Sequence, residues 1–294
     1  DLQAIAVVGD IDVDAVETKI KEIFFPIPAI DNPLPRPQTL LVPKQGIQYL
    51  LITDPEAPES SVSLIIHDRE PDLRAKDADY IRDGYVIALM NRMMSSRFSE
   101  IVQKGTPPFV NGSLNYGSFL ARDYNALVLA ATVSEDQEAR AFEAALTELE
   151  RVRRHGFTSG ELERAKATML ANFENMYKQR DKISNDRWAS RASDHFLTGE
   201  PIPSLDLQYG YYKEMLPEIT LEEVSARLRG LISDDNSFIV VEGPDDRTHL
   251  SEAEAFELVS KVKEADIRPY EDLTGGTDLI GEPLPGAEVI KSVP

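Results

Sequence analysis

Residues 80–117 read YIRDGYVIALMNRMMSSRFSEIVQKGTPPFVNGSLNYG, and this stretch organises the 294-residue chain. Apolar residues recur along its first half at steps of three and four, which predicts a long amphipathic helix. These residues are Ile81, Tyr85, Val86, Leu89, Met90, Met93, Phe98 and Ile101. Gly105 and the prolines 107–108 end the helix, because proline has no amide hydrogen and clashes with the preceding turn. The segment from Phe109 onward has the composition of a strand.

The polar residues Ser95, Ser96 and Arg97 interrupt the apolar pattern near the end of this helix. We expect them to form a small polar turn before the glycine-containing break. The order of parts in this region is therefore a long helix, a polar turn, a break, an aromatic residue and a strand.

Short segments rich in apolar and β-branched residues occur on both sides of this stretch. The expected strands are Ala4–Val8, Ile47–Thr53, Ser61–His67, Phe109–Leu120, Tyr124–Val133 and Phe238–Val241. The fourth and fifth flank residues 121–123 and predict an antiparallel hairpin. The sequence thus predicts an α+β fold with a mostly antiparallel sheet of five or six strands and helices on one face. The other face need not be covered and can line a cavity.

Further helices are indicated by capping signals followed by apolar periodicity. Asp12 is one such cap, and four capping boxes pair Ser134 with Gln137, Thr158 with Glu161, Thr220 with Glu223 and Ser251 with Glu254. Two more helical segments are expected at 181–197 and 205–216. The periodicity fails after Ala265, so we expect a domain at 1–265 and an extended linker at 266–294, with one strand at Ala287–Ile290.

Composition limits the classes of partner. The net charge of −20 argues against nucleic acid or an anionic membrane as partner, and no apolar run is long enough to span a membrane. The chain has no cysteine, which excludes disulfides, thiolate metal sites and cysteine nucleophiles. It opens on the expected strand Ala4–Val8 without a methionine or a signal peptide, so we expect a piece of a longer polypeptide.

The candidate catalytic residues are few. The four histidines are His67, His155, His195 and His249, and no two lie one helical turn apart. His67 has acidic neighbours, Asp68 and Glu70, so an independent enzyme built on His67 is one open hypothesis. No nucleophile elbow, phosphate-binding loop or calcium loop is present, and the residues alone define no catalytic or metal site.

Three segments in this order resemble the pitrilysin/insulinase family of zinc metallopeptidases, which includes the mitochondrial processing peptidases. They are AIAVVGDIDVDAVETKIKEIFFPIP at 4–28, NRMMSSRFSEIVQKGTPPFVNGSLNYG at 91–117 and GFTSGELERAKATMLANFE at 156–174. The resemblance covers about residues 1–265. It implies the second, non-catalytic domain of the family's N-terminal half, with the segment at 266–294 as the start of the hinge between halves.

The departures from the family pattern concern its catalytic residues. The inverted zinc motif H-x-x-E-H is absent from the sequence. The family also has an arginine and a tyrosine, seven residues apart, that assist substrate binding. Aligned on Gly105, those positions are Val102 and Phe109, which lack a guanidinium and a hydroxyl.

The resemblance therefore implies a domain that encloses peptide substrate in a protease chamber but has no activity alone. No cofactor is expected in this chain, and zinc is expected on a preceding domain of the full-length protein. The expected partners are other domains of the same polypeptide and a peptide substrate, for which the strand Phe109–Leu120 could offer an edge. The alternative is a scaffold or peptide-binding part of a catalytically inactive homologue. The missing cysteines and bacterial-looking relatives favour an extracytoplasmic, periplasmic location.

Overall fold

The structure, a computed structural model, describes residues 3–28, 30–32, 41–69, 75–121, 124–133 and 137–272. The strands are β1 Ile47–Thr53, β2 Ser60–Arg69, β3 Asn111–Ser118, β4 Tyr124–Val133 and β5 Ser237–Gly243. The α-helices are α1 Val13–Phe24, α2 Ala78–Val102, α3 Glu138–His155, α4 Ser159–Lys178, α5 Asn185–Thr198, α6 Leu205–Glu218, α7 Leu221–Leu231 and α8 Glu252–Glu264. A 3₁₀ turn at Arg180–Lys182 separates α4 from α5. None of the helices within these ranges is both long enough and apolar enough to cross a membrane.

The five strands form one sheet in the order β1-β5-β2-β4-β3. Only the β1–β5 pair is parallel, and the other three pairs are antiparallel. The expected hairpin is β3–β4, while β5 lies between β1 and β2, which follow each other along the chain. The predicted α+β class with a mostly antiparallel sheet is confirmed.

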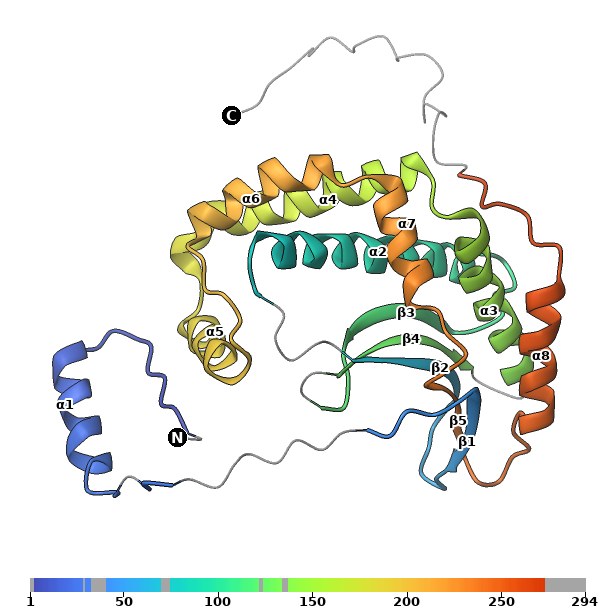
Figure 1. The fold of residues 1–294 in the computed structure, drawn as a ribbon. Helices are drawn as coiled ribbons and strands as arrows, with labels where there is room; N and C mark the ends of the chain where they lie inside the picture. The colour runs from blue at the N-terminus through green and yellow to red at the C-terminus, as the bar shows by residue number, and fades with distance from the viewer. Residues whose placement is uncertain are drawn as a thin grey trace, which may run out of the picture.

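The helices lie mainly on one side of this sheet (Figure 1). Helix α2 packs on β3, and α3 packs on β4 and β2. Helices α4, α6 and α7 pack against α2, and α8 packs against α3, so they form an outer layer. The expected separation of the helices to one face of the sheet is thus observed.

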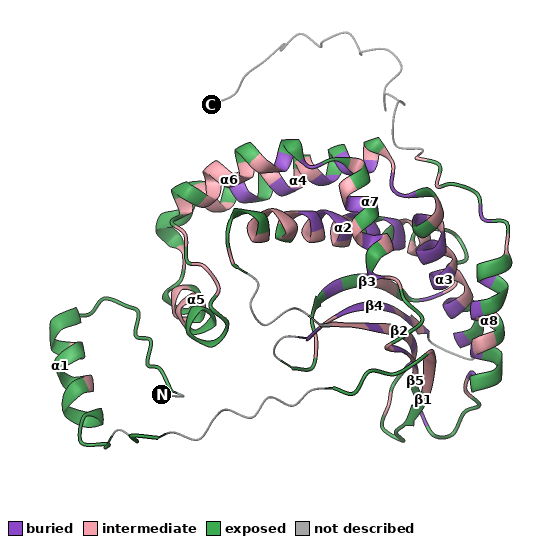
Figure 2. Cartoon of the chain, in the orientation of Figure 1, coloured by how far each residue is buried: buried purple, intermediate pink, exposed green. Residues whose placement is uncertain are grey.

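Helix α2 supplies the centre of the core. Leu89, Met90, Met93 and Met94 are almost completely buried in the hydrophobic core, and most of α2 is buried or partly buried (Figure 2). Complete burial of each such side chain stabilises the fold by about 1.5–3 kcal/mol. The helix also continues through residues 95–97, so the expected polar turn there is wrong. Arg97 can remain helical because it is buried with charged partners, which the local pattern does not reveal.

The capping signals mostly predict the observed helix starts. The boxes at Thr158, Thr220 and Ser251 are formed, and the Asp12 carboxylate accepts the Ala15 amide at 3.0 Å. Helix α3 begins instead after Gln137, whose side chain makes no capping hydrogen bond. Ser134, the other half of that expected box, lies outside the described residues.

The N-terminal segment differs from the expectation. Residues 4–8 form no strand, and Ile5, Val7 and Val8 are 39–49% exposed. A strand requires a hydrogen-bonded neighbour, and no described strand lies beside this segment. Helix α1 forms as expected but has no buried residue, because its apolar side has no partner within the described ranges.

Residues 266–272 contact the domain. Ile267 is buried, its carbonyl oxygen is 2.7 Å from His155 Nε2, and the Tyr270 hydroxyl donates to Glu100 at 2.6 Å. Residues 273–294, including the expected strand Ala287–Ile290, are not described.

Candidate functional site

The sheet has one covered face and one open face. Along β2, Val62, Leu64 and Ile66 are buried beneath the helices, while the alternate residues are only partly buried. Successive side chains of a strand point to opposite faces, so the strand registers define the open face. The open face comprises Gln48, Leu50 and Ile52 of β1, Phe238, Val240 and Glu242 of β5, Ser61, Ser63, Ile65 and His67 of β2, Val128, Ala130 and Thr132 of β4, and Asn111, Ser113 and Asn115 of β3.

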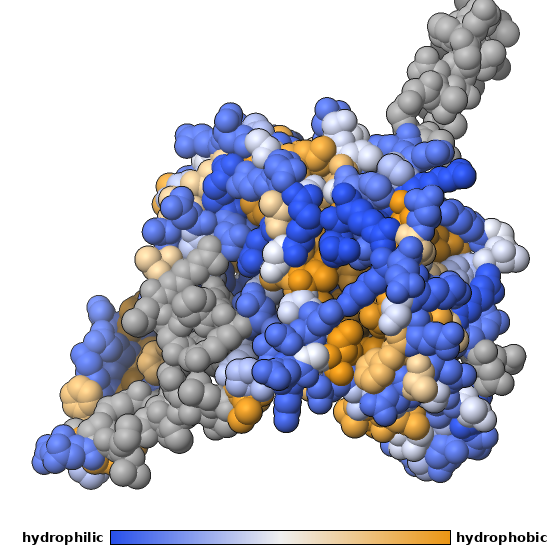
Figure 3. All heavy atoms as spheres, turned by 45° about the vertical axis from the view of Figure 1, so that its right-hand side comes forward, coloured by the Kyte–Doolittle hydropathy of each residue, from blue (hydrophilic) through white to orange (hydrophobic). Residues whose placement is uncertain are grey.

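Apart from Glu242 and His67, this open face is apolar or weakly polar, although the chain is strongly acidic. Leu50 and Ile52 are 50% and 43% exposed, and the Ser61 hydroxyl donates to Glu242 at 3.3 Å. More widely, apolar areas interrupt the hydrophilic surface near the centre of the view in Figure 3. An open sheet face of mostly small, hydroxyl and aliphatic side chains can accept an extended peptide.

His67 lies at one end of the open face, between the rings of Phe119 and Phe238 at centroid distances of 5.3 and 5.2 Å. Burial lowers the pKa of His67, so its neutral form is favoured. The neighbouring Asp68 instead accepts the Tyr116 hydroxyl at 2.7 Å. Glu70 is not described, and the residues that are described assemble no acid–base pair at His67.

The other three histidines bind backbone or buried partners. His195 Nδ1 is 2.7 Å from the Glu200 carbonyl oxygen, and His155 binds the Ile267 carbonyl oxygen. His249 Nδ1 is 2.7 Å from Glu138 Oε1, and its Nε2 is 2.7 Å from the Pro244 carbonyl oxygen. Among the described residues, no three histidine or acidic side chains lie together as a metal site, so they do not fit a zinc ion.

Val102 and Phe109 both lie against the hydrophobic core. Val102 ends α2 and is partly buried, whereas Phe109 is 3% exposed and its ring is 5.8 Å from that of Phe98. A Cβ atom at Gly112 would lie 2.6 Å from Phe98 and 2.7 Å from Phe109, so this glycine lets β3 pass close over both rings. Phe109 therefore has a packing environment. We still predict, from the resemblance, that Phe109 occupies the position of the family tyrosine and Val102 that of the family arginine.

A buried ion pair joins two of the segments singled out in the sequence. Arg97 is 1% exposed and donates from Nε and Nη2 to Glu161 at 2.6 and 2.9 Å. Its Nη1 lies 3.8 Å from Glu148, and the Tyr270 ring lies 4.2 Å from its guanidinium carbon. Glu161 also accepts the Thr158 amide at 2.7 Å, so one carboxylate caps α4 and binds α2. The sequence signal was the polar triplet at 95–97, which local reasoning assigned to a turn.

The fold is thus that of an α+β domain with a helix-covered sheet, an open face and no assembled catalytic site among the described residues. Comparison with known families gives the same class: residues 2–169 match the model described as "Peptidase M16 inactive domain". The chain belongs to the peptidase M16 family.

Individual relatives agree with this assignment. The chain is 23% identical over 232 residues to "Probable zinc protease PqqL" of Escherichia coli (strain K12). The aligned region covers 79% of this chain and 25% of the relative. The first half of the periplasmic protease PqqL from Escherichia coli matches with a TM-score of 0.79 at 20% identity, covering 90% of this chain and 56% of that chain. An insulinase family protease from Yersinia pestis matches with a TM-score of 0.73 at 12% identity, over 86% and 54% of the two chains. This chain therefore spans about a quarter of the length of PqqL.

Proposed function

We propose that this chain is the non-catalytic, substrate-enclosing domain of a pitrilysin-type zinc metallopeptidase that degrades or processes peptides. The open sheet face forms part of the chamber wall, and a preceding domain carries the zinc motif. The observation that supports this role is the asymmetry of the sheet. One face is buried beneath the helices, and on the other Ala130, Val128 and Leu50 are at least partly exposed.

Three observations support the proposal that the zinc site lies on another domain. The matched family model is described as an inactive domain, and the PqqL relative is named a zinc protease. The described residues offer no zinc site. Zinc, when bound to the preceding domain, would supply Lewis-acid chemistry, while this chain would contribute shape and a largely apolar wall. Val102 and Phe109 fit this role because neither side chain can donate a hydrogen bond to a substrate carbonyl.

We further propose that residues 1–265 form the domain and that residues 266–294 link it to the second half of the protease. The first residues of this linker run along the domain, where Ile267 contacts α3 and Tyr270 contacts α2. A periplasmic location is part of the proposal, supported by the matched structure of the periplasmic protease PqqL.

The test places a charged side chain on the open face within the full-length protease. Ala130→Arg is expected to lower kcat/KM for peptide cleavage about tenfold or more, because a large cation obstructs the wall. The matched control is Ala139→Arg, which makes the same change at an exposed position of α3 and should leave cleavage unchanged. Zinc content should be equal in both variants. Unchanged cleavage in Ala130→Arg would contradict the proposed wall.

The sequence preceding Asp1 tests the remaining part of the proposal. An H-x-x-E-H motif there places the zinc as proposed, whereas its absence favours the scaffold role in a catalytically inactive homologue. Zinc bound at one equivalent by residues 1–294 alone would contradict both.

A further inference from the structure

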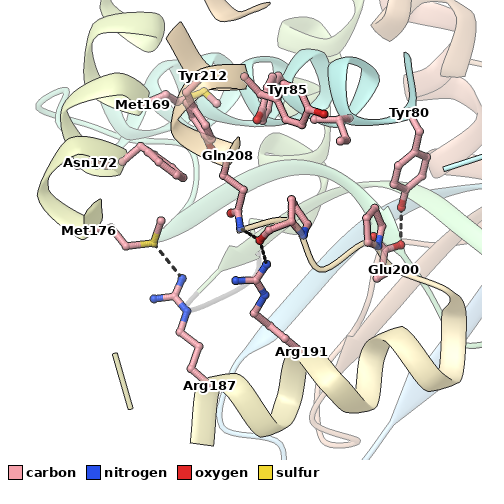
Figure 4. A pocket seen from close by; sticks show the side chains of 15 residues that line it. Tyr80, Tyr85, Met169, Asn172, Met176, Arg187, Arg191, Glu200, Gln208 and Tyr212 are labelled. Carbon is pink, nitrogen blue, oxygen red and sulfur yellow. Dashed lines mark hydrogen bonds between the residues drawn. The ribbon is translucent and has the colours of Figure 1, made fainter. Parts of the chain in front are cut away.

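A cavity of about 500 Å³ lies away from the sheet, between the beginning of α2, the end of α4, and α5 and α6 (Figure 4). Four tyrosines contribute to its lining, namely Tyr80, Tyr85, Tyr211 and Tyr212. Two arginines of α5, Arg187 and Arg191, enter it from the opposite side. Nothing in the role proposed above uses this cavity.

One wall of the cavity is aromatic and rigid. The Phe173 and Tyr212 rings stack with centroids 4.1 Å apart, and Tyr85 contacts Tyr212 at 4.6 Å. Phe173 and Met169 are only 6% and 9% exposed, so this wall is anchored in the core. Burial raises the pKa of Tyr85 and of Tyr212, which keeps both rings neutral. The wall therefore offers an apolar surface to a ligand.

The opposite side of the cavity carries two positive charges. Arg191 Nη2 donates to the Pro203 carbonyl oxygen at 3.2 Å, and Gln208 donates to the same oxygen at 2.8 Å. Arg187 Nη2 lies 3.4 Å from the Met176 sulfur, which is a weak acceptor. Neither arginine forms an ion pair with any carboxylate of the described chain, and most of their donors remain available.

This arrangement is electrostatically unfavourable without a ligand. Arg187 and Arg191 are one helical turn apart, so their like charges repel. Burial and the nearby Arg187 charge both lower the pKa of Arg191. Acidic residues outnumber basic ones 51 to 31 in this chain, and elsewhere arginines pair readily, as Arg82 does with Glu223 at 2.8 Å. The one acid lining the cavity, Glu200, is already bound by Lys76 and Tyr80.

We propose that this cavity binds the C-terminal residue of a peptide, with its carboxylate on Arg187 and Arg191 and its apolar side chain on the Phe173–Tyr212 wall. A C-terminal residue carries both groups on one Cα atom, which matches a cavity that offers both complements within 500 Å³. Paired guanidinium donors suit a planar carboxylate. This inference rests on the proposed function, because it takes peptides as the ligands of the domain. It adds a second peptide-binding site, which lies away from the open face of the sheet.

The test compares two probes, N-acetyl-Ala-Leu-Phe with a free carboxylate and the same peptide as its C-terminal amide. Trp188 is the only tryptophan of the chain and lies 5.0 Å from the Arg191 guanidinium, so its fluorescence reports binding. We expect the free acid to bind residues 1–294 at least about tenfold more tightly than the amide. Equal affinities would overturn the proposal without any variant being required.

Variants then locate the contact. Arg187→Gln combined with Arg191→Gln is expected to remove the difference between acid and amide. The matched control Arg180→Gln removes one charge from the adjacent 3₁₀ turn, where Arg180 contacts Tyr177, and should retain that difference. Retention of the difference in the double variant would place the carboxylate elsewhere and overturn the proposal. Circular dichroism and thermal unfolding verify that each variant is folded.

A third probe, N-acetyl-Ala-Glu-Phe amide, separates the two sources of a carboxylate. If it binds as tightly as the free acid, the cavity recognises an acidic side chain and the C-terminal assignment is wrong. The difference in affinity between acid and amide tests only Arg187 and Arg191, whereas peptide cleavage by the Ala130→Arg variant tests only the chamber wall. Failure of the chamber-wall proposal and failure of the cavity proposal are therefore seen in different variants.

Discussion

Arginine has two very different environments in this molecule. Arg97 lies in the core between α2 and α4, is 1% exposed, and binds Glu161 through two hydrogen bonds. Arg187 and Arg191 lie beside the aromatic cavity and have no carboxylate partner within the described ranges. In the first environment the charge of Arg97 is compensated by Glu161, and only its Nη1 lacks a hydrogen-bond partner among the described residues. In the second environment charge and donors remain available.

This difference shows that an arginine can either stabilise the fold or remain available to bind a ligand. A buried charge is tolerated only when hydrogen bonds and an opposite charge replace water, so removing a partner of Arg97 should lower the free energy of unfolding. A half-exposed charge keeps part of its hydration and can remain unpaired until a ligand arrives. Variants at the two places should therefore affect different measurements.

The largest expected effect is that of Arg97→Met. It leaves Glu161 buried without its cation, which should lower the free energy of unfolding by about 3–5 kcal/mol. Urea unfolding measures this loss. Arg92→Met on the same helix, where no ion pair is seen among the described residues, should cost less than about 1 kcal/mol. A similar loss of unfolding free energy in both variants would show that the Arg97–Glu161 ion pair contributes no more to stability than Arg92 does.

The next effect is that of Glu161→Gln. Glutamine can still occupy the third position of a capping box, so this change isolates the charge from the cap. We expect a loss of about 1.5–3 kcal/mol, the range for hydrogen bonds to charged groups. Thr158→Ala, which removes the cap, should cost about 1 kcal/mol in the same unfolding experiment. A larger loss from the cap variant than from Glu161→Gln would reverse this ranking.

His249 and Glu138 form a second buried pair, in which the charge of the histidine depends on pH. Burial opposes the charged form of His249, but hydrogen bonds to Glu138 and to the Pro244 carbonyl outweigh it and raise the pKa of His249. A raised folded pKa adds stability that is fully present below the unfolded value of about 6.5 and is lost as pH rises through the folded pKa.

His249→Gln should remove this contribution. Denaturant midpoints measured between about pH 6 and about pH 9 should fall less steeply in the variant than in the parent chain. Parallel pH dependences in the two proteins would show that His249 does not titrate with folding.

The smallest effect on stability is expected for Arg187→Gln combined with Arg191→Gln. Removing two like charges at this helical spacing should change the free energy of unfolding by no more than about 0.5 kcal/mol, in the stabilising direction. The same variant is the one expected to lose carboxylate recognition. A loss of several kcal/mol would assign these arginines to the fold and would remove the contrast with Arg97.

Local signals in the sequence predicted much of the secondary structure. Capping boxes at Thr158, Thr220 and Ser251 lie within one turn, so neighbouring residues contain all the information they need. The strand expected at residues 4–8 failed for the opposite reason, since a strand depends on a partner that sequence neighbours do not provide. The turn expected at 95–97 failed because Arg97 is stabilised by Glu161, 64 positions further along the chain.

The candidate sites divide in the same way. The expected antiparallel sheet with helices on one face implied that the other face could remain open, and the strand registers define which residues lie on it. The cavity had no sequence signal, because its lining comes from four helices and its arginines resemble ordinary surface residues in the sequence.

By itself, the sequence determined the capped helices, the α+β class and the absence of a zinc motif, because each depends on residue types at short, fixed spacings. Only the tertiary structure decided that β5 lies between β1 and β2, that Arg97 is neutralised in the core, and that Arg187 and Arg191 face an aromatic wall. These features depend on contacts between residues distant in the sequence, and the free energy of such contacts is set by burial and mutual geometry.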